Sequence, residues 1–343
     1  MMRAKISGLA VALATALLVL TDAALAGMGQ PSPRQVGLQV PVTQVAHEIN
    51  DFHHWVNIVI ILIALFVLAL MVWVVVKFRE SVHPTPSRVT HNTILEVAWT
   101  VVPVVILVLI AVPSFKLLRL QYAFPEPDIT IKATAHQWRW MHTFVDKGGF
   151  EFDSRMIYDA DLLKAKLGEA EFTKRYPNFS APDVCDTGCK SQMYIDAQPL
   201  WAERKMPRLL SVDNEVVLPV GKTVHVLITA SDVIHNWTIP SFGAKVDAVP
   251  GRVTATWFKP EVEGVFYGQC SELCGKDHAY MPIAIRVVKE DVFKNWSDLM
   301  AAAKAETDRA KRRELQDRAR QLIQTVALEQ AGQRLNLAAA VSN

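Results

Sequence analysis

Two long apolar runs occupy the first third of the chain. Residues 55–76 are almost wholly apolar, and a second run extends from about Ile94 to Leu118. Each is long enough to cross a hydrocarbon layer about 30 Å thick, which takes ~20 helical residues. The second run contains Pro103 and Pro113, which membrane helices tolerate better than soluble helices do. The pattern predicts two transmembrane helices, over about 55–76 and 94–118.

Positive charge lies between the two runs. Lys77, Arg79 and Arg88 follow the first run, whereas Arg34 is the only basic residue between position 27 and that run. Basic loops stay on the cytoplasmic side of a membrane. The two helices are therefore expected to form a hairpin with its loop in the cytoplasm and both ends outside.

The first 26 residues are typical of a secretory signal. Arg3 and Lys5 precede an apolar run, and Ala24-Leu25-Ala26 has the form of a cleavage site. The alternative is a third membrane helix, but the apolar run is shorter than a span requires. We expect residues 1–26 to be removed, which agrees with the topology of the hairpin.

Beyond residue 120 the hydrophobic pattern changes to short alternating segments separated by Pro and Gly. Three of them are Asp128–Ala135, Lys222–Thr229 and Ile283–Lys289. Alternation of this kind is typical of a β-sandwich or barrel. We therefore assign 27–120 to a membrane hairpin, 121–290 to an exported β domain, and 291–343 to a helical tail. In the tail Leu315, Ala319, Leu322 and Val326 fall on one helical face, suited to packing on the domain or on a partner.

Residues 159–203 break the alternation. Leu162 to Arg175 has a helical pattern, and Cys185 and Cys189 follow on a polar stretch. Two cysteines this close in an exported domain favour a disulfide. A second metal site is the alternative, but no histidine lies between Tyr158 and Met206.

Composition adds two limits. Apolar residues make up 51% of the chain and charged residues 20%, which suits a protein with a membrane part. The formal net charge of +2 is too small to suggest a nucleic-acid partner. The sequence contains no Cys-x-x-Cys-His, so it shows no c-type heme attachment site.

The richest chemistry lies within twelve residues near the end of the β domain. Cys270, Cys274, His278 and Met281 occur there, and His235 lies upstream. Thiolate, imidazole and thioether ligands select copper, but two cysteines with two histidines are also a zinc set. A disulfide between Cys270 and Cys274 is a third reading. Spacing alone does not choose among copper, zinc and a disulfide.

The loop Cys-Ser-Glu-Leu-Cys-Gly-x-x-His-x-x-Met resembles the CuA loop of cytochrome c oxidase subunit II. The similarity runs from about residue 45 to 296 in the order of that family. It also includes Glu96-Val-Ala-Trp-Thr100, His136-Gln-Trp138, Phe152-Asp-Ser154, Val212-Asp-Asn214, Val249-Pro-Gly-Arg252 and Tyr267-Gly-Gln269. The resemblance implies a membrane-anchored protein whose two-helix hairpin precedes a cupredoxin-like Greek-key β-sandwich and a C-terminal helical tail.

The resemblance also implies a ligand set for two copper ions. Both cysteines bridge the ions, one histidine binds each, and a thioether and a backbone carbonyl complete the axial positions. These residues are His235, Cys270, Glu272 (through its carbonyl), Cys274, His278 and Met281. The Glu272 side chain is then expected to reach a magnesium ion shared with subunit I, since Mg²⁺ prefers oxygen ligands.

Two further residues acquire roles by resemblance. Trp138 matches the tryptophan through which cytochrome c delivers electrons, and Glu96 matches a glutamate at the mouth of a proton channel of subunit I. Without the resemblance, they fit a core aromatic residue and an interfacial carboxylate. Arg139 stands where the family usually has an aromatic residue, and a cation there is expected to repel a basic donor. Asp232 matches a family acidic position beside His235.

The implied function is the electron-accepting subunit of a proton-pumping heme-copper oxidase that reduces oxygen to water in subunit I. Its expected partners are subunit I, other oxidase subunits, cytochrome c and the membrane. Its expected place is the bacterial inner membrane, with the CuA domain in the periplasm. A nitrous oxide reductase is disfavoured by the two spans, and a quinol oxidase subunit by the complete ligand set. A membrane-anchored copper chaperone would explain the two cysteines and the histidine of the loop. It would need none of Trp138, Glu96 and Glu272, so this alternative is disfavoured.

Overall fold

The computed structural model describes residues 28–85, 87–181 and 185–341, with side chains up to residue 331. The chain divides into two compact units, residues 45–124 and the remainder, and each is described by itself. The signal peptide expected over residues 1–26 lies outside the described residues.

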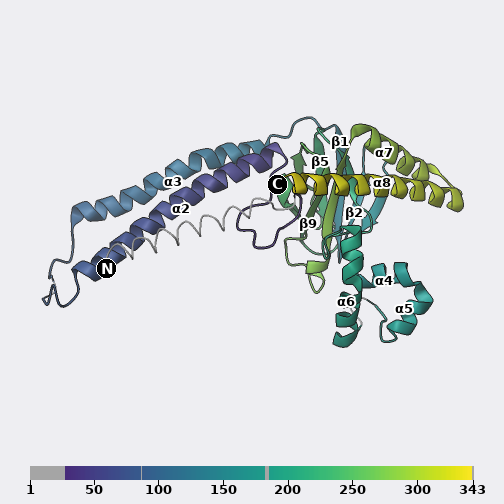
Figure 1. Cartoon of the computed structure of the whole chain (residues 1–343). Helices are drawn as coiled ribbons and strands as arrows, with labels where there is room; N and C mark the ends of the chain where they lie inside the picture. The colour runs from purple at the N-terminus through teal and green to yellow at the C-terminus, as the bar shows by residue number, and fades with distance from the viewer. Residues whose placement is uncertain (1–27, 86, 182–184, 342–343) are drawn as a thin grey trace. The chain divides into compact units, whose positions relative to one another are not determined.

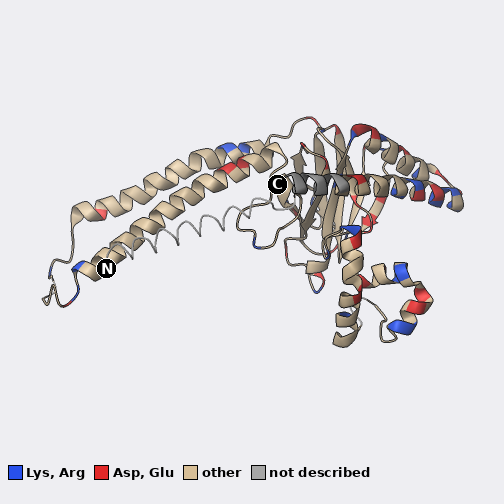
Figure 2. Cartoon of the chain, viewed as in Figure 1, with Lys and Arg blue, Asp and Glu red and all other residues tan. Residues whose placement is uncertain are grey.

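The first of these units is built from the long helices α2 (Gln44–Lys77) and α3 (Thr93–Tyr122) (Figure 1). Both are long and apolar enough to cross a membrane, and the most apolar stretch of each helix is not buried by the rest of the chain. Figure 2 shows their charged residues near the helix ends. Both helices are longer than the expected spans. Helix α2 begins well before residue 55. The prediction missed this part because hydropathy detects the apolar part of a helix and not its polar extension.

Ten strands make up the described β domain, and five of them form its larger sheet. The sheet has the order β3-β2-β1-β5-β8, in which β1 and β5 are parallel and the other neighbours are antiparallel. Its strands are β1 (Ile129–His136), β2 (Arg139–Phe144), β3 (Glu151–Ser154), β5 (Val224–Ala230) and β8 (Thr254–Phe258). Strands β1 and β5 lie where the alternating pattern predicted them.

A second sheet and a hairpin complete the sandwich. The sheet has the order β4-β10-β9, and the hairpin pairs β6 with β7. These strands are β4 (Val216–Pro219), β6 (His235–Ile239), β7 (Ala244–Ala248), β9 (Gly264–Gln269) and β10 (Pro282–Val288). The third predicted strand corresponds to β10.

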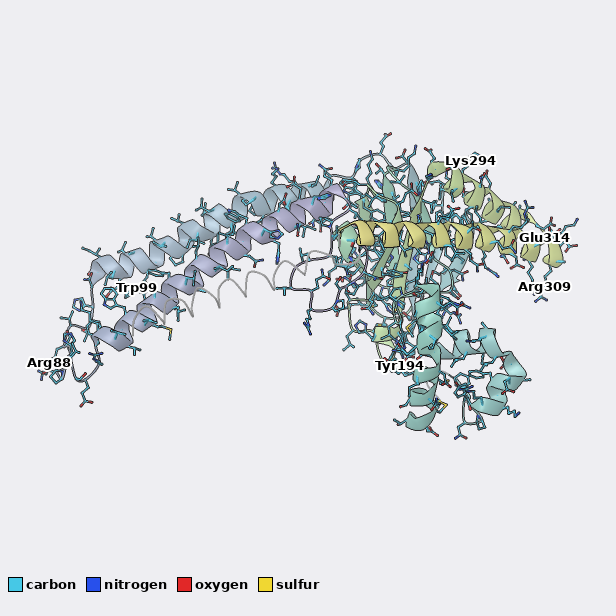
Figure 3. All side chains as sticks on the ribbon, viewed as in Figure 1. Arg88, Trp99, Tyr194, Lys294, Arg309 and Glu314 are labelled. Atoms are coloured by element: carbon cyan, nitrogen blue, oxygen red, sulfur yellow. A yellow bond between two sulfur atoms is a disulfide. The ribbon has the colours of Figure 1, made fainter. Side chains whose placement is uncertain are left out.

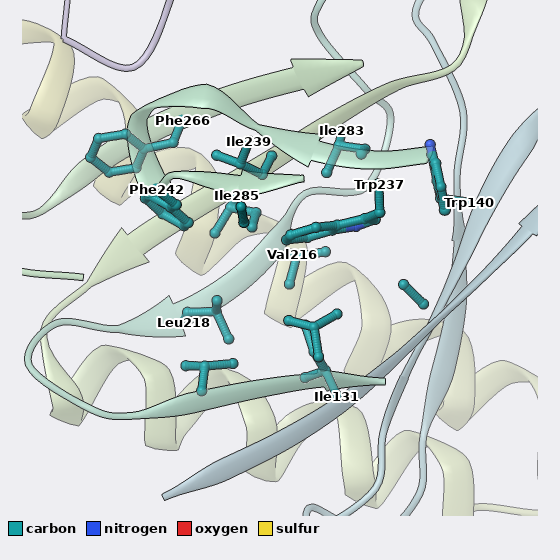
Figure 4. Packing of buried hydrophobic residues seen from close by; sticks show 14 of the residues in the cluster. Ile131, Trp140, Val216, Leu218, Trp237, Ile239, Phe242, Phe266, Ile283 and Ile285 are labelled. Carbon is teal, nitrogen blue, oxygen red and sulfur yellow. The ribbon is translucent and has the colours of Figure 1, made fainter. Parts of the chain in front are cut away.

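The core of the domain lies between these layers. Figure 4 shows Trp237 packed among Ile131, Val216 and Ile285, with Phe242 and Phe266 farther along the same cluster. Burying such a side chain contributes about 1.5–3 kcal/mol. A glycine allows β9 to approach β6, because a Cβ on Gly268 would lie 1.7 Å from the carbonyl oxygen of Thr238.

Strand β10 is buried on both faces, although its sequence alternates. The reason is the helical tail, α7 (Glu290–Ala305) and α8 (Arg309–Val341). The buried Arg286 pairs with Glu215 and donates to Gln330 of α8. On the face predicted from the sequence, Ala319 is buried and Leu322 and Val326 pack on the domain core. In the described residues the tail therefore packs on its own domain.

Three described helices fill the interval where the alternation fails. They are α4 (Asp159–Leu167), α5 (Glu169–Arg175) and α6 (Thr187–Arg204), and we call them the α4–α6 subdomain. The helical pattern expected over Leu162–Arg175 is confirmed, and Gly168, with φ of 80°, divides it into two helices. Helix α6 was not predicted. The subdomain has its own apolar cluster, which includes Phe172, Leu200 and Trp201, and Cys185 is disulfide-bonded to Cys189 as predicted.

Candidate metal centre

Three loops meet at one end of the sandwich. Strands β1 and β5 run parallel, so the segments that follow them leave the sheet at the same edge. These segments are the turn at residues 137–138 and the loop at 231–234. The third loop, residues 270–281, joins β9 to β10 and is closed at its base by the pairing of Gln269 with Pro282. The β topology thus brings together the motifs that carry Trp138, His235 and the two cysteines.

The two sulfur atoms of the loop face each other. The Sγ atoms of Cys270 and Cys274 lie 3.8 Å apart, both side chains are buried, and both cysteines are free. A disulfide has a sulfur–sulfur distance of about 2.05 Å, so the pair is not one. Metal–thiolate bonds are about 2.3 Å long, so a metal ion can bind both sulfurs at this separation.

The remaining donor atoms surround this pair. His235 Nδ1 lies 3.8 Å from Cys270 Sγ, and His278 Nδ1 lies 3.5 Å from Cys274 Sγ. Met281 Sδ is 3.5 Å from Cys274 Sγ, and the carbonyl oxygen of Glu272 is 3.3 Å from Cys270 Sγ. The ligating atoms of His235 and the two cysteines all lie within 4.8 Å of one another. The six residues expected from the sequence are therefore all brought together.

This donor set fits copper by its chemistry. Two thiols, two imidazoles and a thioether are soft or borderline donors, which favour copper over magnesium or calcium. Burial raises the pKa of the Cys270 thiol. Hydrogen bonds to the thiolate, above all that with His235, lower this pKa by more, so the net shift is downward. Burial and the charge of Cys270 raise the pKa of Cys274. One thiol of the pair therefore ionises readily, and a bound cation is needed to make two thiolates favourable.

Asp232 fixes the orientation of His235. Its Oδ1 lies 2.9 Å from His235 Nε2, on the side of the ring opposite Nδ1. An Nε2–H donated to this carboxylate leaves the lone pair of Nδ1 directed at the cysteines, which is the usual arrangement of a metal-bound histidine. The other carboxylate oxygen accepts the amide of Gln137 at 2.6 Å. By resemblance Asp232 was placed at a family acidic position beside His235, but this role was not predicted, although its position three residues before His235 could have indicated it.

The HQWRW segment at residues 136–140 supports the loop from the side. Gln137 Nε2 and Trp138 Nε1 both donate to the carbonyl oxygen of Cys274, at 2.9 and 3.2 Å. Trp140 Nε1 donates to the carbonyl oxygen of Met281 at 3.2 Å. Gly275 permits the close approach, because a Cβ there would lie 3.0 Å from the ring of Trp138. Gln137 and Trp140 therefore position the loop, a role that the sequence did not predict.

The other predicted residues lie outside this cluster. The Glu272 side chain is exposed, while its carbonyl oxygen faces Cys270. Arg139 forms an ion pair with Asp153 at 3.1 Å, so its charge is partly compensated. Glu96 belongs to the other unit, in the first turn of α3, where its carboxylate accepts the amide of Asn92 at 3.2 Å.

Comparisons with known proteins identify the family. The transmembrane-domain model of cytochrome c oxidase subunit II matches residues 31–117, and the periplasmic-domain model matches residues 169–288. A probable cytochrome c oxidase subunit 2 from Rickettsia bellii is 42% identical over 267 residues, which cover 78% of this chain and 84% of the relative. The chain belongs to the cytochrome c oxidase subunit II family.

Further similarities are of the same kind. Cytochrome c oxidase subunit 2 of Cereibacter sphaeroides is 40% identical over 269 residues, covering 78% of this chain and 81% of the relative. The crystal structure of the periplasmic domain of subunit II of cytochrome oxidase from Bradyrhizobium japonicum is 43% identical, with a TM-score of 0.38. It covers 52% of this chain and 96% of that chain.

Membership of this family confirms several expectations. The chain is a membrane protein and a subunit of a heme-copper cytochrome c oxidase, with a periplasmic domain of the CuA type. Its predicted architecture, a pair of apolar helices, a cupredoxin-like β domain and a helical tail, is confirmed as well. The family and the cluster of His235, Cys270 and Cys274 together fit a copper site.

Proposed function

We propose that this chain is the electron-accepting subunit of its oxidase. It takes electrons from cytochrome c at a dinuclear copper centre and passes them to heme in subunit I, where oxygen is reduced to water and protons are pumped. The observation that carries the proposal is the convergence of donor atoms from four residues on the buried sulfurs of Cys270 and Cys274.

Each residue of the centre has a distinct task. Cys270 and Cys274 would hold the two copper ions through their thiolates, and His235 and His278 would supply imidazole nitrogens. Met281 and the carbonyl oxygen of Glu272 would be weak ligands, which tune a redox potential more than they hold a metal. When bound, a copper pair of this kind supplies a one-electron carrier whose unpaired electron is shared by both ions.

The surrounding protein keeps this arrangement rigid and dry. Cys270, Cys274, Met281 and His235 are buried, so water has little access to the sulfurs. Gln137 and Trp140 hold the main chain of the loop, and Asp232 fixes the ring of His235. Rigid ligands change their positions little when the charge of the centre changes, which favours fast electron transfer.

Two carboxylates extend the proposal to the partner subunit. The exposed side chain of Glu272 is free to bind a magnesium ion shared with subunit I. Glu96 stands at the start of α3, which the positive-inside rule places at the cytoplasmic face, and we assign it to the mouth of a proton channel. The membrane is the bacterial inner membrane, and the CuA domain lies in the periplasm.

The test is the copper content and spectrum of the full chain, purified in detergent and loaded with copper. We expect two coppers per chain, a purple colour, and an electron paramagnetic resonance spectrum with hyperfine splitting from two equivalent copper nuclei. Cys270→Ser is the matched loss-of-site variant. Splitting from a single copper, or preferential uptake of colourless zinc, would overturn the dinuclear assignment.

A further inference from the structure

A segment of the chain lies on the β domain before the first membrane helix begins. Residues 28–43, here called the N-terminal segment, contain no helix or strand and continue directly into α2. The segment is the purple trace beside the β domain in Figure 1. It is attached to the domain near Gly29 and again near Val42. Each attachment involves one of the two strands next to the proposed copper ligands.

The first attachment is to the outer edge of β9. Among the described strands β9 has a single sheet neighbour, β10. The main-chain carbonyl oxygen of Gly29 lies at the other edge of β9 and accepts the amide of Tyr267 at 2.8 Å. Met28 packs against the domain core. Because β9 ends at Gln269 and Cys270 follows directly, the N-terminal segment holds the strand that leads into the metal-binding loop.

Only glycine allows this approach. Gly29 has φ of 81°, a conformation that residues with a side chain rarely adopt. A Cβ at this position would lie 2.2 Å from the carbonyl oxygen of Val265 and 2.9 Å from Cδ1 of Phe266. The first of these atoms belongs to the main chain and cannot turn away. Any other residue at position 29 must therefore move the segment off β9 or displace β9 itself.

The second attachment is to the turn that follows β6. The amide of Val42 donates to the carbonyl oxygen of Ser241 at 3.0 Å, and the Ser241 hydroxyl donates to Gln39 Oε1 at 3.0 Å. The side chain of Val42 is buried in the domain core. Ser241 belongs to the short helix η2 (Pro240–Phe242), which follows β6 directly, and β6 begins with His235. The N-terminal segment therefore holds the strand of a second proposed ligand.

These two strands also touch each other. The ring centroids of Phe242 and Phe266 lie 4.9 Å apart at one end of the pair. Near the metal-binding loop the amide of Ser271 donates to the carbonyl oxygen of Asn236 at 3.2 Å. A shift of one strand along the other would therefore change the distance between the donor atoms that the two strands carry.

The N-terminal segment is held mainly at its ends. Val36, Leu38 and Val40 in its middle are exposed. Burial of apolar surface there contributes little to holding the segment in place, because the stabilisation is proportional to the area removed from water. Loss of one attachment should therefore free that end of the segment while the other end stays bound.

We propose that the N-terminal segment is a positioning element of the copper centre. By binding both β9 and the turn after β6, it fixes the register of the two strands. It thereby fixes the placement of His235 relative to Cys270, whose Nδ1 and Sγ atoms lie 3.8 Å apart. Gly29 and Gln39 are its positioning residues. The inference rests on the proposed function, because it assigns the segment a role toward the copper ions.

The first test compares two glycines in the full chain, purified in detergent and loaded with copper. Gly29→Ala imposes a strained φ and a clash. Gly221→Ala imposes a similar strain, since Gly221 has φ of 71°, but a Cβ there would meet no atom within 4 Å. Partners that orient metal ligands commonly change metal affinity by about 10–100-fold, and the segment lies one step further from the metal.

Gly29→Ala should therefore lower copper affinity by roughly 3–10-fold and make the hyperfine splittings from the two coppers unequal. Gly221→Ala should change the affinity by less than about two-fold, because it disturbs no contact with either strand. Competition with a chelator measures the affinity, and electron paramagnetic resonance measures the splittings.

Hydrogen exchange, followed by mass spectrometry, shows whether the segment has left β9. In Gly29→Ala the amide of Tyr267 loses the carbonyl oxygen of Gly29 as its acceptor, so peptides from β9 should exchange faster. The same change is expected without copper, because the contact involves no metal. In Gly221→Ala the exchange of β9 should match that of the native chain.

A milder pair of variants covers the case in which Gly29→Ala does not fold. Gln39→Ala removes the acceptor of the Ser241 hydroxyl and should lower copper affinity by about two- to three-fold. Gln39→Glu keeps an acceptor oxygen and should restore most of the native affinity. Lys294→Ala is the control for the loss of a long side chain, because Lys294 is exposed on α7 and pairs with Asp298 of the same helix (Figure 3).

The outcomes separate the role of the segment from the proposed function. Equal losses of copper affinity in Gly29→Ala and Gly221→Ala would mean that the segment contributes stability and no positioning. Native affinity and unchanged exchange of β9 in Gly29→Ala would overturn the attachment itself. The proposed function stands in both cases. A native chain without the dinuclear copper signal would overturn the proposed function, and the role of the segment toward copper with it.

Discussion

The indole Nε1 of Trp138 donates a hydrogen bond to the main-chain carbonyl oxygen of Cys274 over 3.2 Å. Cys274 also provides one of the two facing sulfurs. The path from the ring to a proposed copper ligand therefore consists of one hydrogen bond and the covalent bonds of a single residue. Gln137 donates to the same oxygen, so the contact is held from two sides.

This path predicts a graded effect of substitutions at Trp138. Trp138→Ala removes both ring and hydrogen bond and should slow electron transfer from cytochrome c by roughly 100-fold, as loss of a positioned contact can. Trp138→Phe keeps a ring but loses a hydrogen bond of about 0.5–1.5 kcal/mol, so its rate should be intermediate. Rapid mixing with reduced cytochrome c measures both. Leu328→Ala, which removes an exposed apolar side chain from α8, is the control, and an unchanged rate in Trp138→Ala would place electron input at another residue.

The contact between Asp232 and His235 predicts a weaker metal site when the carboxylate is lost. Asp232→Asn should reduce copper affinity by about ten-fold or more, because the partners that orient a ligand histidine commonly contribute 10–100-fold. Competition with a copper chelator measures the affinity. Asp153→Asn changes charge near the same end of the domain without touching a ligand and should leave the affinity unchanged. Equal affinity in both variants would show that His235 needs no partner.

The metal-binding loop was predictable because its chemistry is compressed into twelve residues. Its supporting contacts were not, since Asp232, Gln137 and Trp140 reach the loop from segments far away in the sequence. The alternating pattern located β1, β5 and β10. It also predicted that one face of β10 is exposed, whereas both faces are buried. Arg286 has the outward position of an exposed residue, and only the packing of α8 on that face explains its burial.

The α4–α6 subdomain shows the limit of local patterns. The glycine that divides α4 from α5 lies in a helical pattern, and its positive φ is not visible in the sequence. Helix α6 contains Pro199 and begins among polar residues, so hydrophobic periodicity gave no signal for it. Its proximity to Trp138 is a property of the tertiary structure. That α6 and Trp138 line one cavity could therefore not be inferred from the sequence.

The two cysteine pairs are predicted to behave independently. Replacing Cys185 and Cys189 together with Ser should leave the copper spectrum intact, because the disulfide lies in the α4–α6 subdomain and provides no ligand. Opening so short a loop should lower the free energy of unfolding by about 2 kcal/mol or less. Copper spectra and thermal unfolding of the full chain test both parts. Loss of the purple colour in this double variant would mean that the metal-binding cysteines are misassigned.

Glu96 has a structural contact and a proposed proton role, and two substitutions separate them. Glu96→Gln can still accept the Asn92 amide at the start of α3, whereas Glu96→Ala cannot. If the charge matters for proton uptake, both variants should slow oxygen reduction while copper content and the oxidation of cytochrome c at the copper centre stay unchanged. The Ala variant should also lose about 0.5–1 kcal/mol from the start of the helix. Normal turnover in both would return Glu96 to a purely structural role.

His142 predicts how stability depends on pH. Its side chain is fully buried in β2, and burial lowers its pKa from 6.5 to about 3, although the nearby Asp153 acts in the opposite direction. Ser154 Oγ lies 3.3 Å from Nδ1, on a ring that is neutral at physiological pH. The unfolded chain takes up a proton near pH 6.5 and the folded domain does not. Stability from the neutral ring is therefore complete above pH 6.5 and decreases as pH falls toward 3.

The decrease amounts to about 1.4 kcal/mol for each pH unit in that window. His142→Leu removes the titrating group. The free energy of unfolding of the native chain minus that of this variant should therefore decrease as pH is lowered from 7 to 4. Denaturant unfolding of the full chain in detergent, followed at each pH, measures the difference. Other groups that titrate in both proteins cancel in the comparison. A difference that stays constant over this range would show that His142 can be protonated within the folded domain, and that its burial does not exclude water.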